Sequence, residues 1–131
     1  MAELEFCLAA SRHGLIVSKP WGDSSRYDFV ADNGRDLFRV QVRSTGQMNQ
    51  HKYMVKTGYG SPRKYFRRED FHFMAVLVIP QQTWYIIPVS EIVDRKNLYL
   101  PANLETAHSR LDPFRGAWGL LQPERSENPG S

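Results

Sequence analysis

The chain has 131 residues, of which 41% are hydrophobic and 24% are charged, and these values fit one globular domain with a single core. The longest apolar run, Phe73 to Ile79, ends at Pro80 and is too short to span a bilayer, so no membrane association is expected. The N-terminus lacks the pattern of a signal peptide, and the lone Cys7 excludes an intrachain disulfide, so we expect the protein in the cytoplasm.

The positive charge is concentrated in one segment, although the net charge of the whole chain is only +3. Residues 37–68 contain no Asp or Glu, and their basic residues are Arg39, Arg43, Lys52, Lys56, Arg63, Lys64, Arg67 and Arg68. Such a segment is typical of proteins that bind the phosphate backbone of nucleic acids, and a merely solvated basic face is the alternative. The interleaved aromatic residues are Tyr53, Tyr59, Tyr65 and Phe66. They could stack on bases or belong to the core.

Hydrophobic periodicity predicts a helix and a β-hairpin in the first third of the chain. Leu4, Cys7 and Leu8 recur at helical spacing, and Gly14 follows as a stop signal. An Asp-Asn-Gly sequence separates two alternating segments, and it is typical of a hairpin turn because Asn and Gly tolerate positive φ. The expected elements are a helix over 2–13, a strand over 15–18, a loop over 20–25, strands over 27–31 and 37–44, and a turn at 32–34.

The rest of the chain predicts further strands and two short helices. Residues 73–79 are apolar throughout, which is typical of a central strand covered on both faces. Ser90 is a candidate helix cap, and Pro113 suits the first position of a closing helix. We also expect a third hairpin partner over 51–57, a strand over 84–87, and helices over 89–95 and 112–120. A single domain over 1–121 and a flexible C-terminal tail over 122–131 are the expected organisation.

The predicted hairpin gathers polar side chains on one face. Gln41 and Arg43 alternate with apolar residues on the second strand, and Asp28 takes the face opposite to its apolar neighbours on the first. A half-buried carboxylate needs a partner, because an unpaired charge in an apolar setting is costly. A divalent ion such as Mg²⁺ binds carboxylates together with phosphate oxygens and would be one such partner. A structural salt bridge of Asp28 with Arg43 or Arg26 is an equal alternative.

The first helix offers a second acidic group. Glu3 lies one turn before Cys7, at the edge of the face that is expected to pack inward. Glu5 lines up with Arg12 on the outer side, where a surface ion pair is the simpler interpretation. Glu3 is therefore the better candidate for reaching a water molecule on a metal ion.

An ordered set of short motifs runs through the chain: Ala2-Glu3, Gly14, Ser18-Lys19-Pro20-Trp21-Gly22-Asp23, Tyr27-Asp28-Phe29, Arg39-Val40-Gln41-Val42-Arg43-Ser44, Asp70-Phe71 and Trp84-Tyr85-Ile86-Ile87-Pro88. This order resembles the PD-(D/E)XK nuclease superfamily, and most closely its small branch of group I intron-associated homing endonucleases. The similarity covers about 2–88, with weaker agreement up to Trp118. It implies an α+β (mixed α/β) fold with a restriction-endonuclease-like core, in which helices flank a central mixed sheet of four to five strands.

The resemblance implies how a metal ion would be held. Asp28 would bind Mg²⁺ or Mn²⁺, and Gln41 would replace the second acidic residue of the family. The backbone carbonyl of Val42 would help to hold the ion, and Glu3 would position a water molecule on it. Together these residues form the expected metal site.

The family lysine falls at Arg43 in this chain. Arginine keeps the positive charge but is a poor base, because its pKa lies above about 12. Arg43 would therefore stabilise charge, and proton abstraction would need another group, for which Lys19 and Lys52 are the candidates. If the residue at position 43 still performs the role of the family lysine, an Arg43→Lys variant should cleave DNA equally well or better.

These features predict a metal-dependent DNA endonuclease that hydrolyses phosphodiester bonds, with Arg43 in place of the usual active-site lysine. The residues expected to contact double-stranded DNA are Lys19, Trp21, Ser44, Lys52, Lys56, Arg63, Lys64, Arg67 and Arg68. One alternative is a weakly active or inactive DNA-binding protein of the same fold, and another is a protein-interaction module with an incidental basic segment. Because one active site cuts one strand, double-strand cleavage would favour a homodimer or a higher homo-oligomer.

Overall fold

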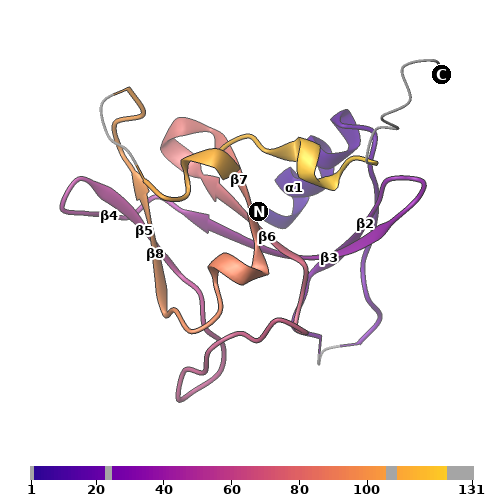
Figure 1. The fold of residues 1–131 in the computed structure, drawn as a ribbon, viewed down its shortest axis with the longest axis horizontal. Coiled ribbons are helices and arrows are strands. Elements are labelled where there is room, and N and C mark those ends of the chain that lie inside the picture. The colour runs from indigo at the N-terminus through magenta and orange to yellow at the C-terminus, as the bar shows by residue number, and fades with distance from the viewer. Residues whose placement is uncertain (1, 23–24, 106–108, 124–131) are drawn as a thin grey trace.

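The computed structural model of the chain describes residues 2–22, 25–105 and 109–123, and in these ranges it contains one α-helix and two β-sheets (Figure 1). The helix α1 spans Ala2–Arg12 and ends before Gly14, whose φ of 77° is in the left-handed region that glycine adopts readily. In Figure 1 α1 lies at the right, and the smaller sheet lies at the left. No helix among the described residues is long and apolar enough to cross a membrane.

The main sheet has five strands in the order β1-β2-β3-β6-β7. Their bounds are Ile16–Ser18 for β1, Phe29–Asp32 for β2, Leu37–Thr45 for β3, Phe73–Val78 for β6 and Thr83–Pro88 for β7. β3 and β6 are parallel and the other neighbours are antiparallel, so the predicted central mixed sheet is confirmed. The buried β6 is the central strand that its apolar sequence predicts.

The hairpin between β2 and β3 follows the turn signal in the sequence. The side-chain oxygen of Asn33 accepts hydrogen bonds from the backbone N–H groups of Arg35 and Asp36, at 2.8 and 2.7 Å. Gly34 has a φ of 93°, which a residue with a side chain rarely adopts. This turn sets the register that places Phe29 opposite Val40.

The two faces of the main sheet carry different cores. On one face, Phe6 and Ala10 of α1 pack with Phe29, Val40 and other apolar residues. The other face is covered by the second sheet, which consists of β4 (Met48–Asn49), β5 (Lys52–Lys56) and β8 (Asn97–Pro101). Its inward residues include Tyr53, Val55, Leu98 and Leu100. The main sheet is therefore sandwiched between a helix and a smaller sheet.

Residues 51–57 do not extend the first hairpin, and this prediction was wrong. They form β5, which pairs with β4 and β8 in the second sheet. The alternation of apolar and polar residues along β5 suits either sheet, and the partner β8 was not predicted because five residues between turns give little periodic signal. The consequence is a second, outward-facing β surface beside β3.

The two predicted short helices are replaced by 3₁₀ turns. The first is Val89–Glu91, where Pro88 is the N-cap and no side chain caps the turn, so Ser90 is not a cap. The closing segment is divided into Asp112–Phe114 and Trp118–Leu121, because Gly116 has a φ of 63° and breaks the helical path. A further 3₁₀ turn, Ile79–Gln81, follows β6. The helices expected around the sheet are thus α1 and short turns, and residues 124–131 of the predicted tail lie outside the described ranges.

Candidate active site

Asp28 lies at the point where β2 separates from β3. Its backbone N–H donates to the carbonyl of Val40 at 2.9 Å, and its Oδ2 accepts a hydrogen bond from the backbone N–H of Val42 at 2.7 Å. The Asp28 carboxylate thus takes the place of the backbone acceptor that the Val42 N–H would have if β2 were longer. The N–H and C=O of one residue in a strand point to the same side, so the Val42 carbonyl also faces this open edge.

Gln41 and Arg43 point to the same face of the main sheet as Asp28. Val40 and Val42 belong to the core under α1, so alternation turns Gln41 and Arg43 to the opposite side. Asp28 precedes Phe29, which is also buried under α1. Because Phe29 pairs with Val40, extending the antiparallel register by one residue places Asp28 opposite Gln41. The hairpin therefore brings the acid, the amide and the guanidinium together.

The Gln41 amide is held at both ends. Its Nε2 donates to the carbonyl of Arg26 at 2.8 Å, and its Oε1 accepts from Nε of Arg43 at 3.3 Å. The amide oxygen, which is the atom that would face a cation, is thereby oriented by a positively charged neighbour. Arg26 is fixed in turn, since its guanidinium lies 4.1 Å from the ring centroid of Tyr59.

Arg43 is bound by the backbone of a neighbouring segment. Its Nη1 donates to the carbonyl of Lys56 at 3.0 Å, and its Nη2 donates to the carbonyl of Gly58 at 3.2 Å. The guanidinium also lies 5.6 Å from the ring centroid of Phe66. Arg43 consequently joins β3 to the end of β5 and the loop after it, and most of its donors are used inside the protein.

The charges at the site act on one another. Burial raises the pKa of the Asp28 carboxyl above its ordinary value, and the negative charge of Glu3 raises it further. The hydrogen bond from Val42 and the positive charges of Arg43 and Lys19 oppose this rise. Burial lowers the pKa of Arg43, and Asp28 opposes that shift. Asp28 forms no salt bridge with Arg26 or Arg43 among the described residues, so the simple ion-pair alternative is not what the structure contains.

Glu3 and Lys19 approach the site from the side of α1. Glu3 is in the first turn of α1, and its Oε1 lies 3.4 Å from Nζ of Lys19, which follows β1. Both side chains are exposed, and both influence the pKa of Asp28. A carboxylate and an ammonium group therefore lie close enough to Asp28 for their charges to act on it.

The other lysine considered as a substitute, Lys52, is not at the site. It lies at the far end of β5, opposite Pro101 of β8. Lys56, at the near end of the same strand, adjoins Arg43 through its carbonyl. A cleft of about 330 Å³ runs along this junction, and Arg43, Ser44, Met54 and Lys56 are among the residues that line it. Ser44 is exposed beside the candidate site.

The basic loop that follows β5 is held by its own contacts. Arg63 Nη1 donates to the carbonyl of Lys96 at 3.2 Å, and Lys64 pairs with Tyr59 in an isolated β-bridge. A side chain at Gly58 would collide with Arg63 and with the backbone of Lys64, so this position requires glycine. Arg67 lies 3.9 Å from Glu69, and Arg68 is exposed.

The aromatic residues of the basic segment divide into two groups. Tyr53 and Phe66 are buried in the core, and Tyr59 packs against it, so stacking on bases is excluded for the buried pair. Tyr65 is 45% exposed. Outside this segment, Trp21 is fully exposed in the loop before Asp28, whereas Trp84 and Trp118 pack around Phe6 as expected of core residues.

No sequence pattern indicates the backbone groups that shape the site. The carbonyls of Arg26, Lys56 and Gly58 accept the hydrogen bonds that orient Gln41 and Arg43. Any residue type supplies a carbonyl, so no composition or spacing rule could have identified these three positions. Only the approach of β5 to β3 makes them part of the site.

The donors at the site suit a hard divalent cation. No group of three or more His, Cys, Asp or Glu that could hold a metal ion occurs among the described residues. The available set is instead the Asp28 carboxylate, the Gln41 amide oxygen and the Val42 carbonyl, all of them oxygen donors of the kind that Mg²⁺ binds with water and phosphate. A half-buried carboxyl whose pKa is raised by burial is the group that a cation would stabilise most.

Comparisons with known proteins agree with this geometry. The sequence matches the family model of PD-(D/E)XK endonucleases over residues 1–113. The structure is similar to that of a bacterial homing endonuclease, I-Ssp6803I, with a TM-score of 0.81 and 26% identity over 92% of this chain and 87% of that one. It is also similar in fold to Hjc, a Holliday junction resolvase from Archaeoglobus fulgidus, with a TM-score of 0.53 and 16% identity over 76% and 80% of the two chains. No curated protein has a sequence that matches.

Proposed function

Because the chain belongs to the PD-(D/E)XK endonuclease family, we propose that it is a divalent-metal-dependent endonuclease that hydrolyses phosphodiester bonds in double-stranded DNA. The observation that carries this proposal is the placement of Asp28, Gln41 and the Val42 backbone at one open edge of β3. The basic residues around this edge favour a polyanionic substrate.

In this proposal Asp28, Gln41 and the carbonyl of Val42 hold Mg²⁺ or Mn²⁺. A bound ion would supply Lewis acidity, since it lowers the pKa of a water molecule and offsets negative charge on the scissile phosphate. Glu3 orients the attacking water from the side of α1. Its repulsion of Asp28 supports this role, because the charge of Glu3 is close enough to raise the pKa of the Asp28 carboxyl.

We assign different tasks to the two basic residues near Asp28, which are Arg43 and Lys19. Arg43 is a positioning residue that orients the Gln41 oxygen, because its guanidinium is bound to Gln41 and to two backbone carbonyls. Lys19 is the cation that faces the scissile phosphate, since it is exposed beside Glu3 and its charge reaches Asp28. Lys19 would supply the electrostatic stabilisation that the family lysine gives elsewhere.

One observation favours a second function, which is DNA binding without cleavage. Because Arg43 donates to Gln41 Oε1, its positive charge stands beside the proposed cation site and opposes metal binding. A DNA-binding protein without cleavage activity would have this property. The choice between the two functions therefore depends on whether a metal ion binds.

The deciding experiment incubates supercoiled plasmid DNA with the protein and Mg²⁺ or Mn²⁺. We expect nicked or linear DNA from the wild-type protein and none from Asp28→Ala, with an Arg12→Ala variant cutting normally. Salt-dependent DNA binding without cleavage by the wild type would favour the inactive alternative. Equal cleavage by Asp28→Ala would show that the catalytic acid lies elsewhere.

A further inference from the structure

The outward face of the second sheet is a polar surface that the proposed cleavage chemistry does not use. Tyr53 and Val55 of β5 and Leu98 and Leu100 of β8 are buried against the main sheet, so the alternate residues face outward. The outward residues are Lys52, Met54 and Lys56 on β5 and Asn97 and Tyr99 on β8. We call these five residues the outer face.

The register of the two strands makes the outer face a compact block. Lys56 lies opposite Asn97, and Met54 lies opposite Tyr99. Neither β5 nor β8 contains an acidic residue, and Tyr99 is 43% exposed. The face therefore combines positive charge, an amide, and apolar side chains without any negative charge from its own strands.

The outer face begins at the candidate active site. The cleft along the open edge of β3 is lined by Arg43 and Ser44 on one side and by Met54 and Lys56 on the other. Thr45 Oγ1 donates to the carbonyl of Met54 at 2.7 Å, which fixes β5 against the end of β3. A DNA backbone that passes along this edge would carry the adjoining base pairs across the outer face.

From these observations we infer that the outer face enters the major groove of double-stranded DNA and reads base pairs beside the cleavage position. This inference rests on the proposed function and deepens it. The major groove is about 12 Å wide and admits a two-stranded β-ribbon, and β4 adds only Met48 and Asn49 to the two long strands. The four-residue distance from Lys52 to Lys56 is roughly 13 Å, the rise of about four base pairs.

The side chains of the outer face are of the types that distinguish bases. An asparagine such as Asn97 can bind adenine through two hydrogen bonds, and a lysine can bind guanine. Met54 and Tyr99 offer apolar contact to the methyl group of thymine. Lys52 and Lys56 also attract the phosphate backbone on either side of the groove.

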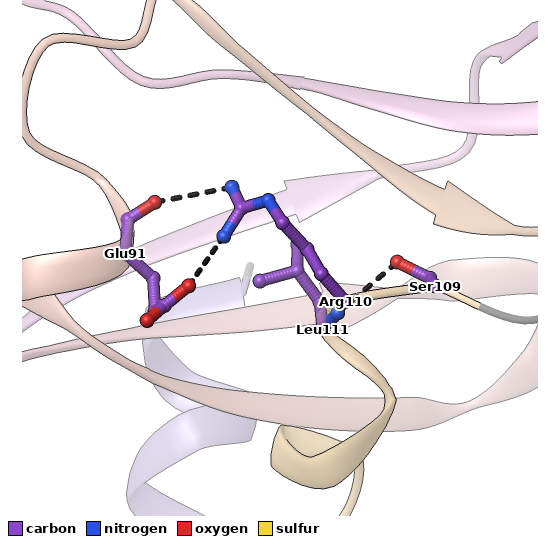
Figure 2. Close-up of polar contacts among 4 residues, drawn as sticks. All are labelled: Glu91, Ser109, Arg110 and Leu111. Atoms are coloured by element: carbon purple, nitrogen blue, oxygen red, sulfur yellow. Dashed lines mark hydrogen bonds and ion pairs between the residues drawn. The ribbon is translucent and has the colours of Figure 1, made fainter.

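A hollow of about 440 Å³ adjoins the outer face. Lys52, Asn97 and Tyr99 of that face line it together with Arg95, Ser109 and Arg110. The guanidinium of Arg110 donates both to the carboxylate and to the backbone carbonyl of Glu91, and Ser109 accepts from the Leu111 N–H (Figure 2). The charge of Arg110 is thus already balanced by Glu91, so the side of the hollow formed by the outer face is the better DNA surface.

The test selects bound sequences from a library of randomised double-stranded DNA, without divalent ions so that no cleavage occurs. We expect the wild-type protein to enrich specific bases over about four adjacent positions, and the Asn97→Ala and Tyr99→Ala variants to lose at least fivefold discrimination at one or two of them. Tyr99→Phe should keep a thymine preference, and Lys52→Ala should weaken binding to all sequences alike. Arg12→Ala, which changes a basic residue of α1, is the matched control.

The outcomes separate this inference from the proposed function. Enrichment that is unchanged in an Asn97→Ala, Tyr99→Ala double variant, or salt-dependent DNA binding with no base preference, would overturn base reading while leaving the nuclease proposal intact. A base preference that depends on Asn97 in a protein that never cleaves DNA would support the inference and overturn the nuclease. Absence of DNA binding would overturn both. Each variant should also have the same thermal unfolding midpoint as the wild type, which would show that the substitutions leave the fold unchanged.

Discussion

Val42 donates its backbone N–H to the carboxylate of Asp28, at 2.7 Å, where the two strands of the hairpin separate. This single contact fixes the acid relative to the strand that carries Gln41 and Arg43. It also occupies only one of the carboxylate oxygens, Oδ2. The other oxygen is then available for a cation beside the Val42 carbonyl, so the contact directly before the first residue of β2 also creates a candidate metal ligand.

The first prediction is that Asp28→Asn leaves the metal-free protein as stable as the wild type at neutral pH, or more stable. The asparagine oxygen can still accept the Val42 N–H, and no buried charge remains. The raised pKa of Asp28 means that the folded state binds this proton more tightly than the unfolded chain, so the contribution of Asp28 to wild-type stability falls as pH rises above about 3.9. Thermal unfolding in the presence of EDTA measures the difference.

The same variant should lose its response to metal. We expect Mg²⁺ or Mn²⁺ to raise the unfolding midpoint of the wild type but not that of Asp28→Asn, because a ligand stabilises only the state that binds it. Asp36→Asn, in the exposed hairpin turn, is a matched control that should respond like the wild type. A metal-induced rise that persists in Asp28→Asn would place the cation elsewhere.

The second prediction concerns pH and metal affinity. Since burial and Glu3 raise the pKa of Asp28, a cation must displace a proton when the pH is near or below that pKa. Affinity for Mg²⁺ should therefore increase with pH through this range and level off above it. Calorimetry in two buffers of different ionisation enthalpy would detect the released proton, and an affinity independent of pH would contradict the assignment.

Sequence reasoning found the hairpin and its polar face because both follow from local rules. Alternation set the side of Gln41 and Arg43, and the Asn33-Gly34 turn set the register. The contacts of Arg43 with Lys56 and Gly58 could not be predicted in this way, because they depend on how a second sheet packs against the first. The segment that was expected to extend the hairpin formed that second sheet instead, since pairing between distant strands leaves no local pattern.

The third prediction assigns phosphate stabilisation to Lys19. Lys19→Met should reduce cleavage by about 100-fold, the effect expected when one group that stabilises developing charge is removed. Lys19→Arg should retain a substantial part of the activity, because it keeps the charge beside Glu3. Single-turnover cleavage measures both variants, and Arg12→Met is a control that removes a basic residue from the last turn of α1. Full activity in Lys19→Met would return the role to Arg43.

The fourth prediction is a loss of stability in mild acid through His72. The backbone N–H of Arg39 donates to Nδ1 of His72 at 2.8 Å, so that nitrogen must be unprotonated. Burial and the charge of Arg39 lower the pKa of His72, so the unfolded chain takes up a proton first as pH falls. The contribution to stability is therefore complete above pH of about 6.5 and decreases below it.

Chemical denaturation from pH 8 to pH 5 checks this expectation. His72→Asn, whose side-chain oxygen can accept the same N–H, should show a weaker decrease over this range. His51→Asn changes an exposed histidine in the β4–β5 turn and should behave like the wild type. If His72→Asn and the wild type have the same pH dependence, protonation of another group governs acid unfolding.

The last prediction is that Arg43→Lys is less stable than the wild type and cleaves more slowly. The sequence alone predicts equal or better cleavage, because lysine is the usual family residue at this position. The structure reverses this expectation, since one ammonium group cannot replace guanidinium bonds to Gln41, Lys56 and Gly58 together. We expect a loss of about 1–3 kcal/mol in unfolding free energy, measured by urea denaturation. Loss of the orienting contact to Gln41 should also reduce cleavage by about 10-fold or more.

Arg39→Lys is the matched control for this experiment. Arg39 lies on the same face of β3, and its guanidinium donates to one carbonyl, that of Glu69, at 2.8 Å. A lysine there can keep a single contact, so both its stability and its cleavage rate should change less than those of Arg43→Lys. An Arg43→Lys variant that is as stable as the wild type and cuts faster would mean that position 43 still performs the catalytic role of the family lysine, and Lys19 would then have no catalytic task.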